Sequence, residues 1–96
     1  MPKRVYISGA MTGVVNYQSR FDKAEELIID SGYKPINPAY IDDVMPDSDY
    51  EDYMKVDMFL LDMCDAIYML KGWEKSCGAN REYGYALAKG KEIMFE

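Results

Sequence analysis

The chain has 96 residues, of which 49% are hydrophobic, and its formal net charge at pH 7 is −6. A chain of this length forms one domain, and its hydrophobic content excludes a disordered protein. Because 17 acidic residues outnumber 11 basic ones and the basic residues form no cluster, the surface repels nucleic-acid polymers and anionic membranes. We therefore expect neither of these partners, whereas a small phosphorylated molecule needs only one local pocket.

Cysteine and histidine usage narrows the possible chemistry. Cys64 and Cys77 are the only cysteines, and we expect both to be free thiols in a reducing compartment. We expect a cytoplasmic protein, because no signal-peptide segment or membrane-spanning apolar run is present in the sequence. The absence of histidine excludes Ser-His-Asp and Cys-His catalysis and His-based zinc sites. Any chemistry must come from carboxylates, hydroxyls, lysine, arginine or backbone amides, and we expect no metal or cofactor.

The first half of the chain is typical of a strand, a helix, a second strand and an acidic loop. A β-rich run at residues 5–8 ends at a glycine and predicts the first strand. A helix is expected over residues 16–31, because apolar residues recur at helical spacing, namely Phe21, Ala24, Leu27 and Ile28. Residues 33–36 predict the second strand. Residues 39–49, with one proline and four aspartates, predict an acidic surface loop.

The second half adds two helices and two strands. The helix expected over residues 50–63 has an apolar face formed by Val56, Phe59, Leu60 and Met63. The continuous apolar run at residues 66–70 is typical of a central parallel strand that is buried on both faces. A third helix is expected over residues 78–89, with a buried stripe of Ala79, Tyr83, Ala86 and Leu87. Residues 92–95 predict the last strand.

This alternation predicts a doubly wound α/β fold in a single domain over residues 1–96. Its four strands should form a parallel sheet in the order 2-1-3-4, with right-handed crossovers and helices on both faces. In such sheets a ligand binds outside the carboxyl ends of the strands, near a switch in strand order. We expect a small nucleotide-like ligand at that edge.

Gly9 and Gly13 enclose the loop after the first strand. Their spacing is neither a dinucleotide-binding motif nor a Walker loop. Glycines let the backbone approach a ligand, and the following helix can offer its amide-rich end to an anion. A tight turn without a ligand is an equally good interpretation of this loop.

Two carboxylates lie next to apolar helix faces. Glu82 is one turn into the third helix, at the margin of its buried stripe and at the same edge of the sheet as the first loop. Asp57, on the second helix, has mostly apolar neighbours on the helical wheel, namely Tyr53, Leu60, Leu61 and Cys64. A carboxylate in such surroundings is costly unless it has a partner or a task. The pattern alone slightly favours structural roles, a helix-dipole contact for Glu82 and a local cap or pair for Asp57.

Three other polar or aromatic residues also have structural interpretations. Asp65 follows the second helix and favours a structural turn. Trp73 offers a surface on which a base could stack, but packing within its loop is the more favoured role. Tyr6, in the first strand, fits the core if its hydroxyl finds a partner.

Three short motifs occur in order along the chain. They are Tyr-Ile-Ser-Gly-Ala-Met-Thr-Gly at residues 6–13, Asp57 eight residues before Asp65, and Ser76-x-Gly78-x-x-x-Glu82-x-Gly84-x-Ala86. Together they resemble the nucleoside 2-deoxyribosyltransferase superfamily, and most closely its short bacterial and phage branch. That superfamily also contains the 2′-deoxynucleoside 5′-monophosphate N-glycosidases. The resemblance covers nearly the whole chain and implies a Rossmann-like or flavodoxin-like fold.

The resemblance also implies roles for particular residues. Glu82 corresponds to the nucleophile that attacks C1′ of the deoxyribose, Asp57 to the acid that protonates or orients the departing base, and Tyr6 to the tyrosine that positions the nucleophile. The implied substrate-binding residues are Ser8, Gly9, Ala10, Thr12, Gly13, Ser76 and Gly78. Cleavage of an N-glycosidic bond passes through an oxocarbenium-like sugar, so one carboxylate captures C1′ while another group assists the leaving base. This chemistry needs neither histidine nor metal.

We therefore expect cleavage or base transfer on a 2′-deoxynucleoside or its 5′-monophosphate. By resemblance, Ser76 favours the monophosphate, since nucleoside-specific members place an acid at this position. The first loop is a departure, because the monophosphate glycosidases have a serine and an arginine at the positions of Ala10 and Thr12. The alternative is a non-catalytic nucleotide-binding or sensor module of the same fold. The end of the chain at Glu96, before a segment that completes the site of longer transferases, favours this alternative, whereas the two carboxylates favour an enzyme.

Overall fold

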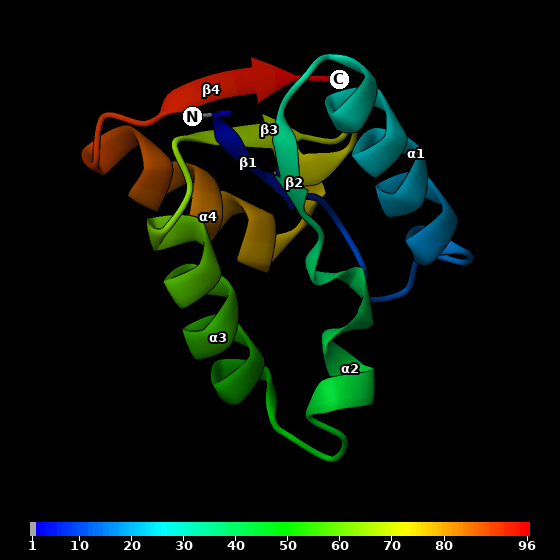
Figure 1. The fold of residues 1–96 in the computed structure, drawn as a ribbon. Helices are drawn as coiled ribbons and strands as arrows, with labels where there is room; N and C mark the ends of the chain where they lie inside the picture. The colour runs from blue at the N-terminus through cyan, green and yellow to red at the C-terminus, as the bar shows by residue number, and fades with distance from the viewer. Residues whose placement is uncertain (1) are drawn as a thin grey trace.

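The computed structural model describes residues 2–96 as a parallel sheet with helices on both faces (Figure 1). The strands are β1 (Arg4–Ser8), β2 (Lys34–Ile36), β3 (Ala66–Met69) and β4 (Glu92–Phe95). All adjacent strands pair in parallel, in the order β2-β1-β3-β4. The predicted fold class and strand order are therefore confirmed.

The helices are α1 (Tyr17–Asp30), α2 (Ile41–Val44), α3 (Tyr50–Asp62) and α4 (Cys77–Ala88), with 3-10 turns η1 (Pro38–Tyr40) and η2 (Trp73–Lys75). One face of the sheet is covered by α1, and the other by α3 and α4 (Figure 1). This division follows from topology, because the chain moves one way from β1 to β2 and the other way from β2 to β3. Right-handed crossovers then place the connecting helices on opposite faces.

The alternation of side chains along β1 decides what each face receives. Val5 and Ile7 belong to the apolar cluster under α1, whereas Tyr6 belongs to the cluster under α3 and α4. Ser8 has the same parity as Tyr6 and is also buried. The strand pattern therefore directs two hydroxyl groups toward the face that α4 covers.

The buried stripes of the helices are narrower than the sequence predicts. Each of the three long helices buries residues at positions i, i+3 and i+7, and these are Phe21, Ala24 and Ile28 on α1, Met54, Asp57 and Leu61 on α3, and Ala79, Glu82 and Ala86 on α4. Our expectation that Leu87 is buried is wrong, since it is exposed, and Leu27, Phe59 and Met63 on the predicted apolar faces are exposed as well. A helix that packs on a sheet buries only one row of its side chains here, and the flanking rows face solvent. Glu82 consequently lies in the middle of its stripe, not at the margin.

The segment expected as an acidic loop over residues 39–49 contains η1 and the short helix α2. Its start has a recognisable signal, because the side chain of Asn37 accepts a hydrogen bond of 3.0 Å from the backbone N–H of Ala39, and Pro38 occupies the first helical position. Figure 1 shows α2 beyond the end of the sheet, across from α3. None of the helices within residues 2–96 has the length and apolar character to cross a membrane.

We propose that the chain self-associates, as its many apolar side chains indicate, and that the outer face of α3 contributes. Phe59 on this face is 70% exposed, beside Lys55, Val56 and Leu60 in a shallow depression. Light scattering at micromolar concentration should give at least the mass of a dimer, and Phe59→Asp should lower that mass. A monomeric wild-type protein would remove this proposal.

Candidate active site

A pocket of about 800 Å³ lies at the carboxyl end of β1. The loop after β1, the beginning of α1, helices α2 and α3, and the beginning of α4 all contribute to its wall. Its lining residues are Gly9, Ala10, Met11, Thr12, Tyr17, Ile41, Asp42, Tyr50, Tyr53, Met54, Asp57, Lys75, Ser76, Cys77, Gly78, Ala79 and Glu82. The pocket is therefore where a doubly wound sheet of this strand order is expected to bind a ligand.

Glu82 is the polar centre of this pocket, although only 5% of its surface is exposed. The hydroxyl of Tyr6 donates a hydrogen bond of 2.7 Å to Oε2 of Glu82, and the hydroxyl of Ser8 donates one of 2.6 Å to Oε1. Both donors come from β1 and point to the same face of the sheet. Each carboxylate oxygen is thereby fixed by one donor and retains lone-pair capacity toward the pocket.

Asp57 lies on the same pocket wall as Met54, one turn along α3, and is 7% exposed. Its Oδ1 is buried and has no hydrogen-bond partner within residues 2–96. A buried polar atom without a partner costs about 1–3 kcal/mol, so folding alone does not favour it. The arrangement suits a carboxyl group that meets a ligand atom.

Burial raises the pKa of both carboxyl groups. The pKa of Glu82 rises to about 7, since desolvation and the charge of Asp57 outweigh the lowering effect of the Ser8 and Tyr6 hydrogen bonds. The pKa of Asp57 rises to about 6 through desolvation, with a contribution from the charge of Asp42. Burial and the charges of Glu82 and Asp57 raise the pKa of Tyr6 well above its usual range, so its hydroxyl stays a donor. Between about pH 6 and 7 the two carboxyl groups together hold about one proton.

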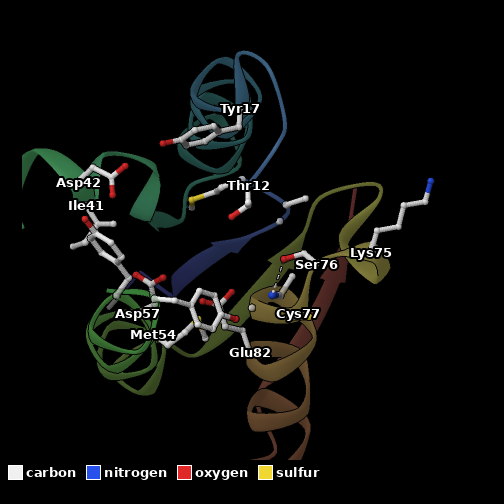
Figure 2. Close-up of a pocket in the computed structure, with 17 residues that line it drawn as sticks. Thr12, Tyr17, Ile41, Asp42, Met54, Asp57, Lys75, Ser76, Cys77 and Glu82 are labelled. Atoms are coloured by element: carbon white, nitrogen blue, oxygen red, sulfur yellow. Dashed lines mark hydrogen bonds between the residues drawn. The ribbon is translucent and has the colours of Figure 1, made fainter. Parts of the chain in front are cut away.

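The beginning of α4 forms the opposite wall. The side chain of Ser76 caps the helix by accepting a hydrogen bond of 3.1 Å from the backbone N–H of Ala79. A Cβ on Gly78 would lie 3.2 Å from Sδ of Met54, so glycine here lets α4 approach α3 closely. Figure 2 shows Ser76 and Lys75 on one side of the pocket, Asp42 and Asp57 on the other, and Glu82 between them.

Most of the residues assigned from the sequence converge on this place. Tyr6 and Ser8 form hydrogen bonds with Glu82. The assigned residues that line the pocket are Gly9, Ala10, Thr12, Asp57, Ser76, Gly78 and Glu82. Gly13 does not line it. This exposed residue has a φ of +76°, which fits a turn that favours glycine.

The structural interpretations of two other residues fit the structure. The carboxylate of Asp65 accepts a hydrogen bond of 3.0 Å from the backbone N–H of Arg4, which joins the turn to β1. The ring of Trp73 packs against Tyr83 at a centroid distance of 4.6 Å and does not line the pocket.

Sequence reasoning missed several lining residues, among them Tyr17, Ile41, Asp42, Tyr50 and Lys75. Tyr50, Tyr53 and Met54 share a helix face with Asp57 at spacings of seven, four and three residues, a pattern that is visible on a helical wheel centred on Asp57. Asp42 had no such signal, because a helix of four residues is too short to show a period. Residues 2–96 contain no group of three or more Cys, Asp or Glu side chains placed to hold a metal ion.

The chain shares its fold with solved enzymes. It is similar to a 2-desoxiribosyltransferase from Leishmania mexicana, with a TM-score of 0.75 and 24% identity over 98% of this chain and 63% of that one. It is also similar to a 2-deoxyribosyltransferase from Bacillus psychrosaccharolyticus (TM-score 0.73, 17% identity, 96% of this chain and 70% of that one). A third similar structure is that of the CMP N-glycosidase BcmB from Clostridium botulinum (TM-score 0.61, 23% identity, 97% of this chain and 67% of that one).

These likenesses confirm the resemblance to the deoxyribosyltransferase superfamily at the level of the fold. The chain spans 63% of the length of the Leishmania enzyme. A family model described as a domain of unknown function (DUF4406) matches residues 3–95. No curated protein sequence matches the chain.

The raised pKa of Glu82 predicts how stability depends on pH. Because the folded state holds the Glu82 proton up to about pH 7, this titration alone should lower the unfolding free energy by about 3 kcal/mol as pH rises from 4.5 to 7, and the raised pKa of Asp57 should add to the loss. Glu82→Gln removes this titration, so the variant should be more stable than wild type at pH 8 but not at pH 4.5. Urea unfolding at the two pH values measures the difference.

Glu74→Gln is the matched control, because Glu74 is exposed and lies outside the pocket. It should follow the pH dependence of wild type. Glu82→Gln should retain only the shallower dependence that Asp57 causes. If its dependence is as steep as that of wild type, Glu82 is not held in the environment described above.

Proposed function

The chain belongs to the family described as a domain of unknown function (DUF4406), and we propose that it cleaves the N-glycosidic bond of a 2′-deoxynucleotide or exchanges its base for another. The reason is that its pocket brings two buried carboxylates together. The observation that carries the proposal is Glu82, fixed by Tyr6 and Ser8 and facing the pocket that Asp57 shares. The activities of the three solved enzymes with this fold support the same class of reaction.

In the proposed first step, the Glu82 carboxylate forms a bond to C1′ of the deoxyribose. The bond between C1′ and the base nitrogen breaks, and its electron pair leaves with the base. Asp57, in its protonated form, transfers its proton to the departing base. The product is a glycosyl ester on Glu82 and an ionised Asp57.

In the second step, water or another base attacks C1′ of this ester. Asp57 takes the proton that the incoming group releases, and the electron pair of the ester bond returns to the carboxylate of Glu82. Water gives hydrolysis and a base gives transfer. This exchange of roles is the one that retaining glycosidases use with their two carboxyl groups.

The electrostatics of the site determine how much of the protein is in the protonation state that reacts. The hydrogen bonds from Tyr6 and Ser8 offset part of the cost of burying the ionised Glu82. The two carboxyl groups hold about one proton between pH 6 and 7, mostly on Glu82, because its pKa of about 7 exceeds the value of about 6 for Asp57. The reactive form, with the proton on Asp57 and the charge on Glu82, is therefore the minor form of the free protein. Removal of the charge of Asp57 should lower the pKa of Glu82, since that charge raises it.

We propose a 5′-phosphate on the substrate, bound at the beginning of α4. Ser76 uses its oxygen as an acceptor in the cap, which leaves its hydroxyl hydrogen to donate to a phosphate. The first backbone amides of α4 lie beside it. Lys75 lines the pocket on this side, and its side chain extends outward from the pocket in Figure 2. If it turns inward when a phosphate binds, it supplies the positive charge that the first loop lacks at Thr12. We propose that the substrate also contacts Gly9, Ala10 and Thr12, three of the first-loop residues that line the pocket.

Glu82→Gln should abolish release of free base from 2′-deoxynucleoside 5′-monophosphates, because an amide is a poor nucleophile. The measurement is chromatography of the products from a panel of deoxynucleosides and deoxynucleotides. Glu74→Gln, outside the pocket, should retain wild-type activity.

Asp57→Asn tests the second carboxyl group in the same assay. The substitution should slow the cleavage of substrates with poor leaving bases more than that of substrates with activated ones. It should also shift the acidic limb of the pH–rate profile toward lower pH, since the pKa of Glu82 falls. Full activity of Glu82→Gln would contradict the covalent mechanism.

Binding of the nucleotides by wild type without any base release would instead support the non-catalytic module.

The 5′-phosphate proposal predicts a higher kcat/KM for deoxynucleoside monophosphates than for the matching deoxynucleosides. Ser76→Asp should lower kcat/KM for the monophosphate by at least about tenfold, because two negative charges repel each other. Lys75→Gln should lower it by about fivefold through loss of one attractive charge near the surface. The unphosphorylated nucleoside is the internal control and should respond little to Lys75→Gln. A wild-type preference for that nucleoside would overturn the proposal.

A further inference from the structure

Asp42 is a second acid on the pocket wall that carries Asp57, and the mechanism above does not use it. It is held there by α2, the short helix that follows η1. In Figure 2, Asp42 and Asp57 lie on the same side of the pocket, away from Ser76 and Lys75. The charge of Asp42 raises the pKa of Asp57, as expected for two acids that face one space.

Asp42 lies close to one other lining residue, Tyr53, and burial and the Asp42 carboxylate raise the pKa of the Tyr53 hydroxyl. That hydroxyl donates a hydrogen bond of 2.8 Å to the backbone carbonyl of Met45. Within residues 2–96 no lysine or arginine forms an ion pair with Asp42. Its neighbour Asp43 has the same place in the first turn of α2 but does not line the pocket. The unpartnered Oδ1 of Asp57 faces the same region, so this wall holds one buried polar atom that lacks a protein partner.

On the basis of the proposed function, we propose that Asp42 selects the base of the substrate. With Glu82 at C1′ and Ser76 at the phosphate, the base must extend toward α2 and α3, where Asp42 and Asp57 lie. The pair fits a base whose exocyclic amino group is next to an imine-type ring nitrogen, as in cytosine and adenine.

The hydrogen-bonding capacity of the two acids leads to this choice. An ionised carboxylate only accepts hydrogen bonds, so Asp42 matches an amino group. A protonated carboxyl group donates one, so Asp57 matches the ring nitrogen and delivers the proton there. Uracil, thymine and hypoxanthine present a carbonyl oxygen in place of the amino group. That oxygen would face the Asp42 carboxylate, and two acceptors without a hydrogen repel each other.

The experiment compares substrates that differ only in this group, dCMP with dUMP and dAMP with dIMP. Wild type should favour the amino member of each pair in kcat/KM by about 10- to 100-fold. Asp42→Asn should reduce that ratio at least about tenfold, because its amide can donate to a carbonyl oxygen. Asp43→Asn is the matched control and should leave the ratio unchanged, since Asp43 lies outside the pocket.

The readouts separate this inference from the proposed function. Base release without an amino preference, or with a preference that Asp42→Asn leaves intact, overturns the role of Asp42 while the cleavage activity stands. If no nucleotide is cleaved, the proposed function fails, and calorimetric Kd values for the same four nucleotides then decide. A tighter Kd for the amino members that Asp42→Asn abolishes supports Asp42 as the base-selecting residue. Equal Kd values, or no binding at all, overturn it.

Discussion

The contact of Glu82 with Tyr6 and Ser8 is the interaction on which the proposed site depends. A carboxylate in the middle of a helix stripe that faces a sheet is unfavourable, and here two hydroxyl donors from one strand meet its two oxygens. For this to occur, the alternation of side chains along β1 must direct both hydroxyl groups toward α4, and the helical spacing along α4 must direct Glu82 toward β1. The same contact holds Glu82 in the pocket beside the carboxyl end of β1, so the fold and the proposed chemistry depend on one interaction.

The rest of the pocket is arranged around that point with opposite electrostatic character on its two sides. Lys75, Ser76 and the amide end of α4 favour an anion, whereas Asp42 and Asp57 favour groups that donate hydrogen bonds. A nucleotide has this same polarity, with its phosphate at one end, its sugar carbon in the middle and its base at the other end. The net charge of −6 is therefore compatible with binding a small anion, because the local arrangement rather than the total charge acts on the ligand.

The fold was predictable because strand–helix alternation and right-handed crossovers leave few topologies for four strands. The roles of Glu82, Asp57 and Tyr6 came from the resemblance, since pattern alone slightly favoured structural roles for both acids. The expected burial of Leu87 was wrong, and Leu27 and Phe59 on predicted apolar faces are exposed, because apolar spacing does not tell how many rows of a helix the sheet covers. Asp42 was missed because α2 has only four residues, and its place in the pocket depends on tertiary contacts.

The central claim is that Glu82 carries the sugar covalently during the reaction. The most direct measurement is mass spectrometry of the protein after an acid quench during turnover of a deoxynucleoside 5′-monophosphate, followed by proteolysis to locate the modification. The account predicts a deoxyribosyl 5′-phosphate adduct on Glu82 that forms and decays with turnover and is absent in Glu82→Gln. Base release with an adduct on another residue, or with none at any time during turnover, would contradict it.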